Sequence, residues 1–148
     1  MPPVLVDTNV MVYFYDNNTP KKQKRAELVL NRLREAGLGR LSTQNLAEFV
    51  NAAMRKLDPP MTAVRAFNQA ALFAATCPIF NLTPQIVLEA ARGVRDHKLA
   101  YYDAQIWAAA RLNQIPVVFS EDFQDGQTLE GVRFANPFLP TFDLEAWL

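Results

Sequence analysis

The sequence predicts an α/β protein in which helices cover a mainly parallel central sheet. Short apolar runs alternate along the chain with longer segments whose apolar residues recur at helical spacing. Two of these runs, 4–6 and 117–119, contain only β-branched and large apolar residues, which is typical of strands buried on both faces of a parallel sheet. The length of 148 residues is that of one ordinary domain, so we expect residues 1–148 to form a single domain.

Local signals place the elements in order. The first strand ends at Asp7, and Thr8 or Asn9 is a suitable cap for a short helix after it. Thr19 and Pro20 open the second helix, because proline is favoured in the first helical turn. The other boundaries expected are the end of that helix near 37–39, a strand at 41–43, helices at 44–57 and 61–75, a strand at 79–82, helices at 84–96 and 102–113, and a strand at 117–120.

The composition is that of a globular protein with no overall charge. Half of the residues are hydrophobic and 20% are charged, and 15 lysine and arginine residues balance 15 aspartate and glutamate residues. This composition excludes a disordered tail and a generally basic DNA-coating protein. The balance is uneven along the chain, because residues 20–40 hold seven basic and two acidic groups and residues 114–148 hold one basic and six acidic groups.

The terminus and the cysteine content predict a cytoplasmic protein. The first three residues lack the basic flank of a signal peptide, and no stretch reaches the roughly 18 uncharged apolar residues of a membrane span. Cys77 is the single cysteine, so an internal disulfide is excluded. The chain also lacks a cysteine and histidine cluster that would hold zinc. We therefore expect no membrane association.

Four acidic residues stand where a charge is normally avoided. Asp7 follows a buried strand, Glu48 lies between Leu46 and Phe49 of an amphipathic helix, Asp103 opens a strongly apolar helix, and Asp122 follows the last strand. Each has an ordinary alternative role: Asp7 as a helix cap, Glu48 as a solvent-facing residue, Asp103 as a carboxylate at a helix start, and Asp122 as a turn residue. If they converge, pairs about 5 Å apart repel by roughly 3 kcal/mol at an effective dielectric near 20.

Such a cluster needs cations. Hard oxygen ligands without histidine or thiolate favour Mg²⁺ or Mn²⁺ over zinc or copper. Those metals polarise phosphoryl oxygens and help ionise water, so phosphodiester hydrolysis is the natural reaction class.

Four segments of the chain resemble the acidic motifs of PIN domains, in their usual order. They read VLVDTNV at 4–10, LSTQNLAEF at 41–49, YYDAQI at 101–106 and VFSEDF at 118–123. The tail segments 131–133 and 136–138 are similar to those of VapC toxins within that family. The resemblance covers nearly the whole chain.

The resemblance implies a PIN-like three-layer α/β/α sandwich and a Mg²⁺- or Mn²⁺-dependent endoribonuclease that cuts RNA with metal-activated water. It also implies a homodimer held inactive by a cognate VapB-type antitoxin. The metal ligands would be Asp7 and Asp103, with Glu48 and Asp122 completing the acidic pocket. Residues that orient these ligands or water would be Asn9 and Ser120, and Asp125 would replace or join Asp122.

Several features leave alternatives open. The basic run 21–25 is either an RNA phosphate contact or a solvated helix face. Arg92, Arg95, His97 and Lys98 would form a second phosphate-facing patch beside the pocket, with His97 more reasonably a surface residue than a general base. We expect Tyr101 and Tyr102 to pack at a helix start rather than to stack on a base. We expect some of the many aromatic side chains to form an intersubunit or antitoxin surface; the candidates are Phe14, Tyr15, Phe67, Phe73 and Trp107.

Other functions compete with the nuclease. A catalytically silent PIN-like module that binds RNA or protein is one, although such a module has no reason to keep four costly carboxylates. An aspartate-dependent phosphotransferase is another, but position 9 is Asn where that chemistry usually has a second aspartate. A nucleotide-binding fold is disfavoured, because only five glycines are present and neither G-x-G-x-x-G nor a Walker loop occurs.

Overall fold

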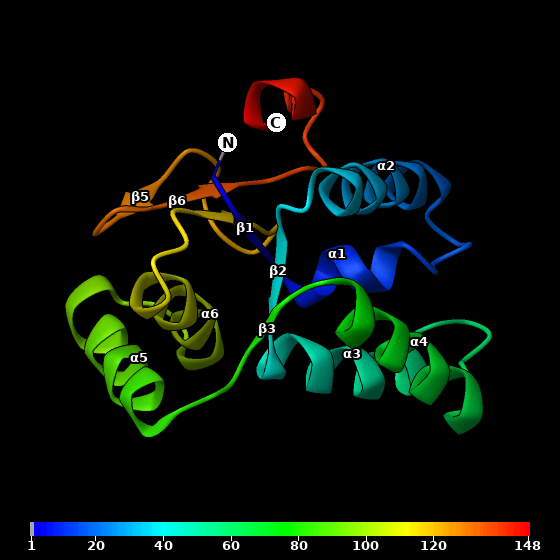
Figure 1. Ribbon diagram of the computed structural model, residues 1–148, viewed down its shortest axis with the longest axis horizontal. Coiled ribbons are helices and arrows are strands. Elements are labelled where there is room, and N and C mark those ends of the chain that lie inside the picture. Colours follow the sequence, from blue (N-terminus) through cyan, green and yellow to red (C-terminus); the bar gives the residue numbers. More distant parts are fainter. Residues whose placement is uncertain (1) are drawn as a thin grey trace.

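The computed structural model describes residues 2–148 and confirms the α/β class (Figure 1). Its central sheet has the strand order β3-β2-β1-β4-β6-β5, and every neighbouring pair is parallel except β5 and β6. The strands are β1 Val4–Val6, β2 Gly39–Ser42, β3 Ile79–Phe80, β4 Val117–Phe119, β5 Thr128–Leu129 and β6 Val132–Ala135.

The helices begin close to the predicted residues, because side chains cap several of them. Thr62 and Thr83 each accept a hydrogen bond from a backbone amide three residues later, and Ser42 forms a capping box with Asn45. The helices are α1 Thr8–Tyr13, α2 Pro20–Ala36, α3 Thr43–Arg55, α4 Ala63–Thr76, α5 Pro84–His97, α6 Tyr101–Leu112 and the 3-10 helix η1 Leu144–Trp147.

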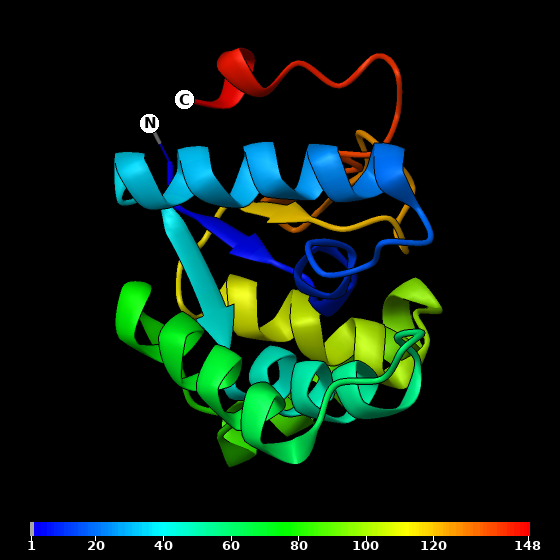
Figure 2. The same ribbon diagram turned by 90° about the vertical axis from the view of Figure 1, so that its right-hand side faces the viewer.

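The sheet lies between two helical layers. Helices α5 and α6 cover one side. Helices α1 to α4 and the C-terminal η1 contribute buried residues to the apolar cluster on the other side, and η1 lies next to α2 (Figure 2). The side chains of β1 alternate accordingly: Val4 and Val6 belong to the apolar cluster that contains Leu33 of α2, and Leu5 belongs to the cluster that contains Trp107 of α6. This arrangement is the predicted α/β/α sandwich.

Strand β1 is the topological switch point of the sheet: β2 and β3 are added on one side of it, and β4, β6 and β5 on the other. It pairs with β2 on one side and with β4 on the other, both in parallel. Ligands in such sheets bind beyond the carboxyl ends of the strands at this switch point. The segments after Val6 and Phe119, which are register partners, therefore meet at one edge.

The hairpin of β5 and β6 and the helix η1 were not predicted. Glu130 and Gly131 both have positive φ, at 47° and 85°, and form the two-residue turn between paired Leu129 and Val132. The turn lacks the Asn-Gly or Asp-Gly signature, and its first strand has only two residues, so the sequence offers little signal for it.

The expectation that Trp107 lies on an interaction surface is wrong. Its side chain is fully buried between α5 and α6, and its indole nitrogen donates to the Leu129 carbonyl at 3.1 Å. Gly93 of α5 makes this packing possible, because a Cβ there would lie 2.8 Å from the Trp107 ring. Phe67 differs, since 71% of its surface is exposed on α4. Over residues 2–148, no helix has both the length and the apolar character needed to cross a membrane.

Candidate functional site

Asp7 lies buried at the edge where the parallel strands end. Its amide donates to the Phe119 carbonyl at 2.9 Å, which continues the pairing of β1 with β4. Its Oδ1 accepts from the Thr8 amide and its Oδ2 accepts from the Ser120 hydroxyl, both at 2.7 Å. Only 4% of Asp7 is exposed, and burial raises the pKa of its carboxyl group to about 7 in spite of these bonds. Near neutral pH this group therefore needs a proton or a nearby cation.

Asn9 and Ser120 connect Asp7 to Asp122. The Asn9 amide nitrogen lies 3.2 Å from Asp122 Oδ2, 3.4 Å from Ser120 Oγ and 3.5 Å from Asp7 Oδ2. Ser120 Oγ also accepts from the Asp122 backbone amide at 3.0 Å. The Asn9 Oδ1 atom is buried and has no hydrogen-bond partner among the described residues. The two residues thus link the carboxylates at the ends of β1 and β4.

Glu48 approaches from α3 and is held at both carboxylate oxygens. Thr8 donates its hydroxyl hydrogen to Oε2 at 3.1 Å, and Gln44 donates its amide to Oε1 at 2.7 Å. Gln44 lies one helical turn before Glu48 on the same face of α3. The two donors fix the orientation of this carboxylate.

Asp103 sits in the first turn of α6, as predicted. Burial raises the pKa of its carboxyl group, and the nearby charges of Asp122 and Glu48 raise it further. The same two charges also raise the pKa of Asp7. Asp122 and Glu48 therefore lie within electrostatic range of both Asp7 and Asp103.

A cavity of about 370 Å³ opens at this cluster. Three of the four carboxylates line it, and Asp103 is not among its lining residues. The polar residues around it are Asp7, Thr8, Asn9, Tyr13, Asp16, Glu48, Lys56, Glu121 and Asp122.

The donor set suits a hard divalent cation. Carboxylate and amide oxygens are the ligands that Mg²⁺ and Mn²⁺ prefer. Burial raises the pKa of Asp7, and the buried Asn9 Oδ1 has no hydrogen-bond partner among the described residues, so a nearby cation would stabilise both groups. Within residues 2–148, no group of three or more acidic, histidine or cysteine side chains is arranged so that it could hold a metal ion without some movement. The residues therefore fit such an ion by their chemistry and charge.

The structure places Asp125 away from this cluster. Its Oδ1 accepts from the Asn136 backbone amide at 2.8 Å, and Asp125 does not line the cavity. The neighbour of Asp122 on the other side, Glu121, lines the cavity instead. Of the two aspartates in this loop, only Asp122 faces the other carboxylates.

The basic run has more than one role. Lys22 donates to Glu121 at 2.9 Å and to the Tyr13 hydroxyl at 3.1 Å, at the wall of the cavity. Arg25 donates to the carbonyls of Pro137 and Phe142, so it ties α2 to the C-terminal segment. Lys21 and Lys24 are exposed.

Three of the four residues in the second basic patch form ion pairs, and none of the four lines the acidic cavity. Arg92 pairs with Glu89, Asp96 and Glu130, and His97 lies 2.7 Å from Glu130. His97 also contacts the Trp107 ring, so it supports α5 and the hairpin.

Sequence reasoning missed three contributors to the site. Gln44 binds Glu48, and its spacing of four residues from Glu48 was a usable signal. Tyr13 and Glu121 form a hydrogen bond of 2.6 Å across the cavity wall. That contact joins residues 108 positions apart, so only the fold reveals it.

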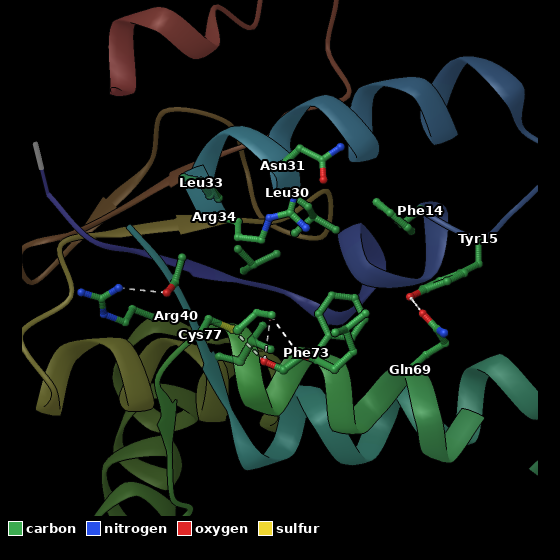
Figure 3. Close-up of a pocket in the computed structure, with 15 residues that line it drawn as sticks. Phe14, Tyr15, Leu30, Asn31, Leu33, Arg34, Arg40, Gln69, Phe73 and Cys77 are labelled. Atoms are coloured by element: carbon green, nitrogen blue, oxygen red, sulfur yellow. Dashed lines mark hydrogen bonds between the residues drawn. The ribbon is translucent and has the colours of Figure 1, made fainter. Parts of the chain in front are cut away.

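A separate apolar pocket of about 120 Å³ lies between α2 and α4, next to β2 (Figure 3). Leu30, Leu33 and Phe73 form much of its wall, and Leu72 at its margin is 55% exposed. Arg34 and Arg40 add positive charge to its lining. The pocket is thus an apolar depression with a basic margin.

Comparison with protein families finds the PIN domain, whose model matches residues 4–124. A search of curated protein sequences finds no match.

Solved structures with a similar fold include a toxin-antitoxin complex from Klebsiella pneumoniae, with a TM-score of 0.66 and 19% identity, covering 90% of this chain and 97% of that one. DNA-bound VapBC from Salmonella typhimurium gives a TM-score of 0.64 and 17% identity, and the match covers 93% of this chain and 99% of that one. VapC20 from Mycobacterium tuberculosis, described as a sarcin-ricin loop cleaving toxin, gives a TM-score of 0.58 and 18% identity. The match covers 80% of this chain and 91% of that one.

Proposed function

The chain belongs to the PIN domain family, and on that premise we propose that it is a metal-dependent endoribonuclease of the VapC type. It hydrolyses RNA phosphodiester bonds and is the toxin of a toxin-antitoxin pair that acts in the cytoplasm, with residues 1–148 forming one PIN domain. The observation that carries the proposal is that Glu48 and Asp122 lie near both Asp7 and Asp103: burial raises the pKa of Asp7 and of Asp103, and the charges of Glu48 and Asp122 raise both further. A binding module without catalysis gains nothing from this repulsion.

Asp7 and Asp103 would hold Mg²⁺ or Mn²⁺, with Glu48 and Asp122 completing the acidic pocket. When bound, the cation supplies Lewis-acid polarisation of the phosphoryl group and lowers the pKa of an attacking water. Asn9 and Ser120 keep the Asp7 and Asp122 oxygens in place through the hydrogen bonds described above. Thr8 does the same for Glu48.

The proposed RNA path runs along an open cavity of about 760 Å³ beside the acids. It shares Thr8, Glu48 and Lys56 with the acidic cavity, so a strand lying in it would pass the carboxylates. Lys56 is placed to contact a phosphate, and Tyr102, 67% exposed, forms part of the wall. An unpaired, single-stranded segment fits this path better than a duplex.

The proposed antitoxin is a VapB-type protein that docks at the apolar pocket between α2 and α4. Amphipathic helices bind grooves of this kind through apolar anchors. Leu72 of α4, 55% exposed, and Leu30 of α2 give this pocket apolar side chains on both of its helices. The toxin-antitoxin complexes among the similar structures support the choice of partner class.

We also propose a homodimer formed through the exposed apolar surface of α5. Leu88 of α5 is 72% exposed and its neighbour Val87 is 38% exposed. Exposed apolar side chains of this size favour contact with another chain.

RNA cleavage tests the nuclease proposal. Purified protein should cut a structured RNA with loops when Mg²⁺ or Mn²⁺ is present and should stop in excess EDTA. Asp7→Asn and Asp103→Asn should abolish cutting while the circular dichroism spectrum stays unchanged. Asp143→Asn is the matched control, because Asp143 caps η1 far from the acids and Asn caps equally well. Cutting that survives both substitutions and EDTA would refute the proposal.

A further inference from the structure

We propose that Gln44 is a positioning residue that sets the affinity of the acidic cluster for its cation, through a hydrogen-bonded ladder of Tyr101, Gln105, Gln44 and Glu48. The inference rests on the proposed function, because it assumes that the cluster binds a divalent cation. It assigns a role to two buried glutamines and a tyrosine that lie within the acidic motif segments 41–49 and 101–106 but are not themselves acidic.

The ladder joins two helices through their side chains. Tyr101 OH donates to Gln105 Oε1 at 2.9 Å, one turn along α6. Gln105 Nε2 donates across to Gln44 Oε1 at 2.8 Å, and Gln44 Nε2 donates to Glu48 Oε1 at 2.7 Å, one turn along α3. The helix that carries Asp103 is thereby connected to the carboxylate of Glu48.

The direction of the ladder follows from its Glu48 end. The carboxylate of Glu48 can only accept when it is ionised, so the Gln44 nitrogen must face it. The Gln44 oxygen then faces the Gln105 nitrogen, and the Gln105 oxygen faces the Tyr101 hydroxyl. Reversal of either amide would place like groups against each other at one of these contacts. The ionised Glu48 therefore fixes both amide orientations, and the Tyr101 hydroxyl, which can donate or accept, donates to Gln105.

Gln44 also contacts the backbone beside Asp103. Its nitrogen donates to the Tyr102 carbonyl at 3.0 Å as well as to Glu48, so both of its amide hydrogens are used. Tyr102 immediately precedes Asp103 in the first turn of α6. One amide group thus spans the two elements that deliver Glu48 and Asp103, and it sets their separation.

Burial makes this arrangement stiff. Gln44 is 9% exposed and Gln105 is 4% exposed. A buried amide that loses a partner cannot replace it with water, so the ladder resists alternative rotamers. Cation affinity depends on such outer contacts, because they keep the ligand oxygens in place before the ion arrives. The ladder therefore lowers the cost of gathering the carboxylates around a cation.

Manganese binding tests the proposal without relying on cleavage. Mn²⁺ titrations of the purified full chain, followed by electron paramagnetic resonance, would compare the wild type with Gln44→Met, Tyr101→Phe and Gln69→Met. Methionine keeps the approximate size of Gln44 and removes its hydrogen bonds. We expect a Kd for Mn²⁺ about tenfold weaker in Gln44→Met and about threefold weaker in Tyr101→Phe.

Gln69→Met is the matched control. Gln69 accepts from the Tyr15 hydroxyl at 2.6 Å on α4, so the substitution removes a glutamine–tyrosine contact away from the acids. We expect the wild-type Kd for Mn²⁺ in this variant. A purely structural ladder would lower the melting temperature of Gln44→Met without changing its Kd.

The outcomes separate the two proposals. If the wild type binds Mn²⁺ and the folded Gln44→Met variant binds it equally well, the ladder has no positioning role, and the nuclease proposal stands. If Gln44→Met fails to fold, the subtler Tyr101→Phe decides in the same way. If the wild type itself binds no Mn²⁺ at millimolar concentration, the proposed metal dependence is wrong, and the inference about Gln44 is overturned with it.

Discussion

The Ser120 hydroxyl donates a hydrogen bond of 2.7 Å to Asp7 Oδ2 across strands β1 and β4. The two residues are 113 positions apart in the chain, and their meeting follows from the pairing of Val6 with Phe119. This contact holds the most buried carboxylate of the cluster in a fixed rotamer.

Loss of this hydroxyl should weaken the site without unfolding the protein. Ser120→Ala removes a bond that lowers the pKa of Asp7, so the pKa rises further and the acid limb of the cleavage pH profile moves to higher pH. We expect roughly a 10–100-fold loss of cleavage at neutral pH. Thr76→Ala, which removes an exposed hydroxyl on α4, should leave the profile unchanged. An unshifted acid limb in Ser120→Ala would contradict this role.

Asp7 should make the metal-free protein less stable as the pH rises. Its pKa is about 7 in the folded state and near 3.8 as a free side chain, so between these values the folded chain binds more protons than the unfolded chain. The free energy of unfolding therefore falls from about pH 4 to about pH 7, by up to about 4 kcal/mol from this group at 1.36 kcal/mol per unit.

Asp7→Asn should remove the contribution of Asp7 to the pH dependence of the free energy of unfolding. Urea unfolding in EDTA would show the variant more stable than the wild type at pH 8, with the difference vanishing near pH 4. Added Mg²⁺ should restore the wild type and leave the variant unaffected. An equal pH dependence of the free energy of unfolding in the two proteins would contradict the raised pKa of Asp7.

Gly93→Ala should destabilise the packing of α5 on α6. Alanine normally favours a helix interior over glycine by about 1 kcal/mol, but here its Cβ would lie 2.8 Å from the rigid Trp107 ring. We expect the free energy of unfolding to fall by about 1–3 kcal/mol in urea titrations. At Gly39 the new Cβ meets Leu33 at an ordinary 3.6 Å, so Gly39→Ala should change stability much less. A stabilised Gly93→Ala protein would show that the helices can separate without cost.

Leu88→Asp should disrupt the proposed homodimer. A charge in an apolar interface costs far more than the same charge in water. Sedimentation equilibrium should give a dimer for the wild type and a monomer for the variant. Leu28→Asp changes an exposed leucine on α2 and should leave the dimer intact. A wild type that is monomeric at micromolar concentration would rule out this interface.

The sequence predicted the central fold well because its signals there are local. The runs at β1 and β4, the threonine caps and the proline at α2 each act within a few residues, and the structure places those elements within a few positions of expectation. The β5–β6 hairpin escaped prediction, because its stability comes from pairing with β4 and from the burial of Phe134 rather than from turn residues. Trp107 escaped for a similar reason, since its partner Gly93 comes from another helix.

The site was predictable in part. The four carboxylates stood out, because each broke a local pattern of apolar residues. Their proximity depends on parallel strands ending at one edge, which the predicted topology already required. The contact of Gln44 with Glu48 had a usable signal in its spacing of four residues. The contacts of Gln105 and Tyr13 had none, because they join residues far apart in the chain that only the packing of α6 and α1 against their neighbours brings together.

The most direct test of the central claim is an anomalous scattering map from a crystal soaked in Mn²⁺. The account predicts a strong peak about 2–2.5 Å from carboxylate oxygens of Asp7 and Asp103, which disappears in Asp7→Asn. Strong Mn²⁺ peaks elsewhere in the crystal, with none between these two residues, would contradict it.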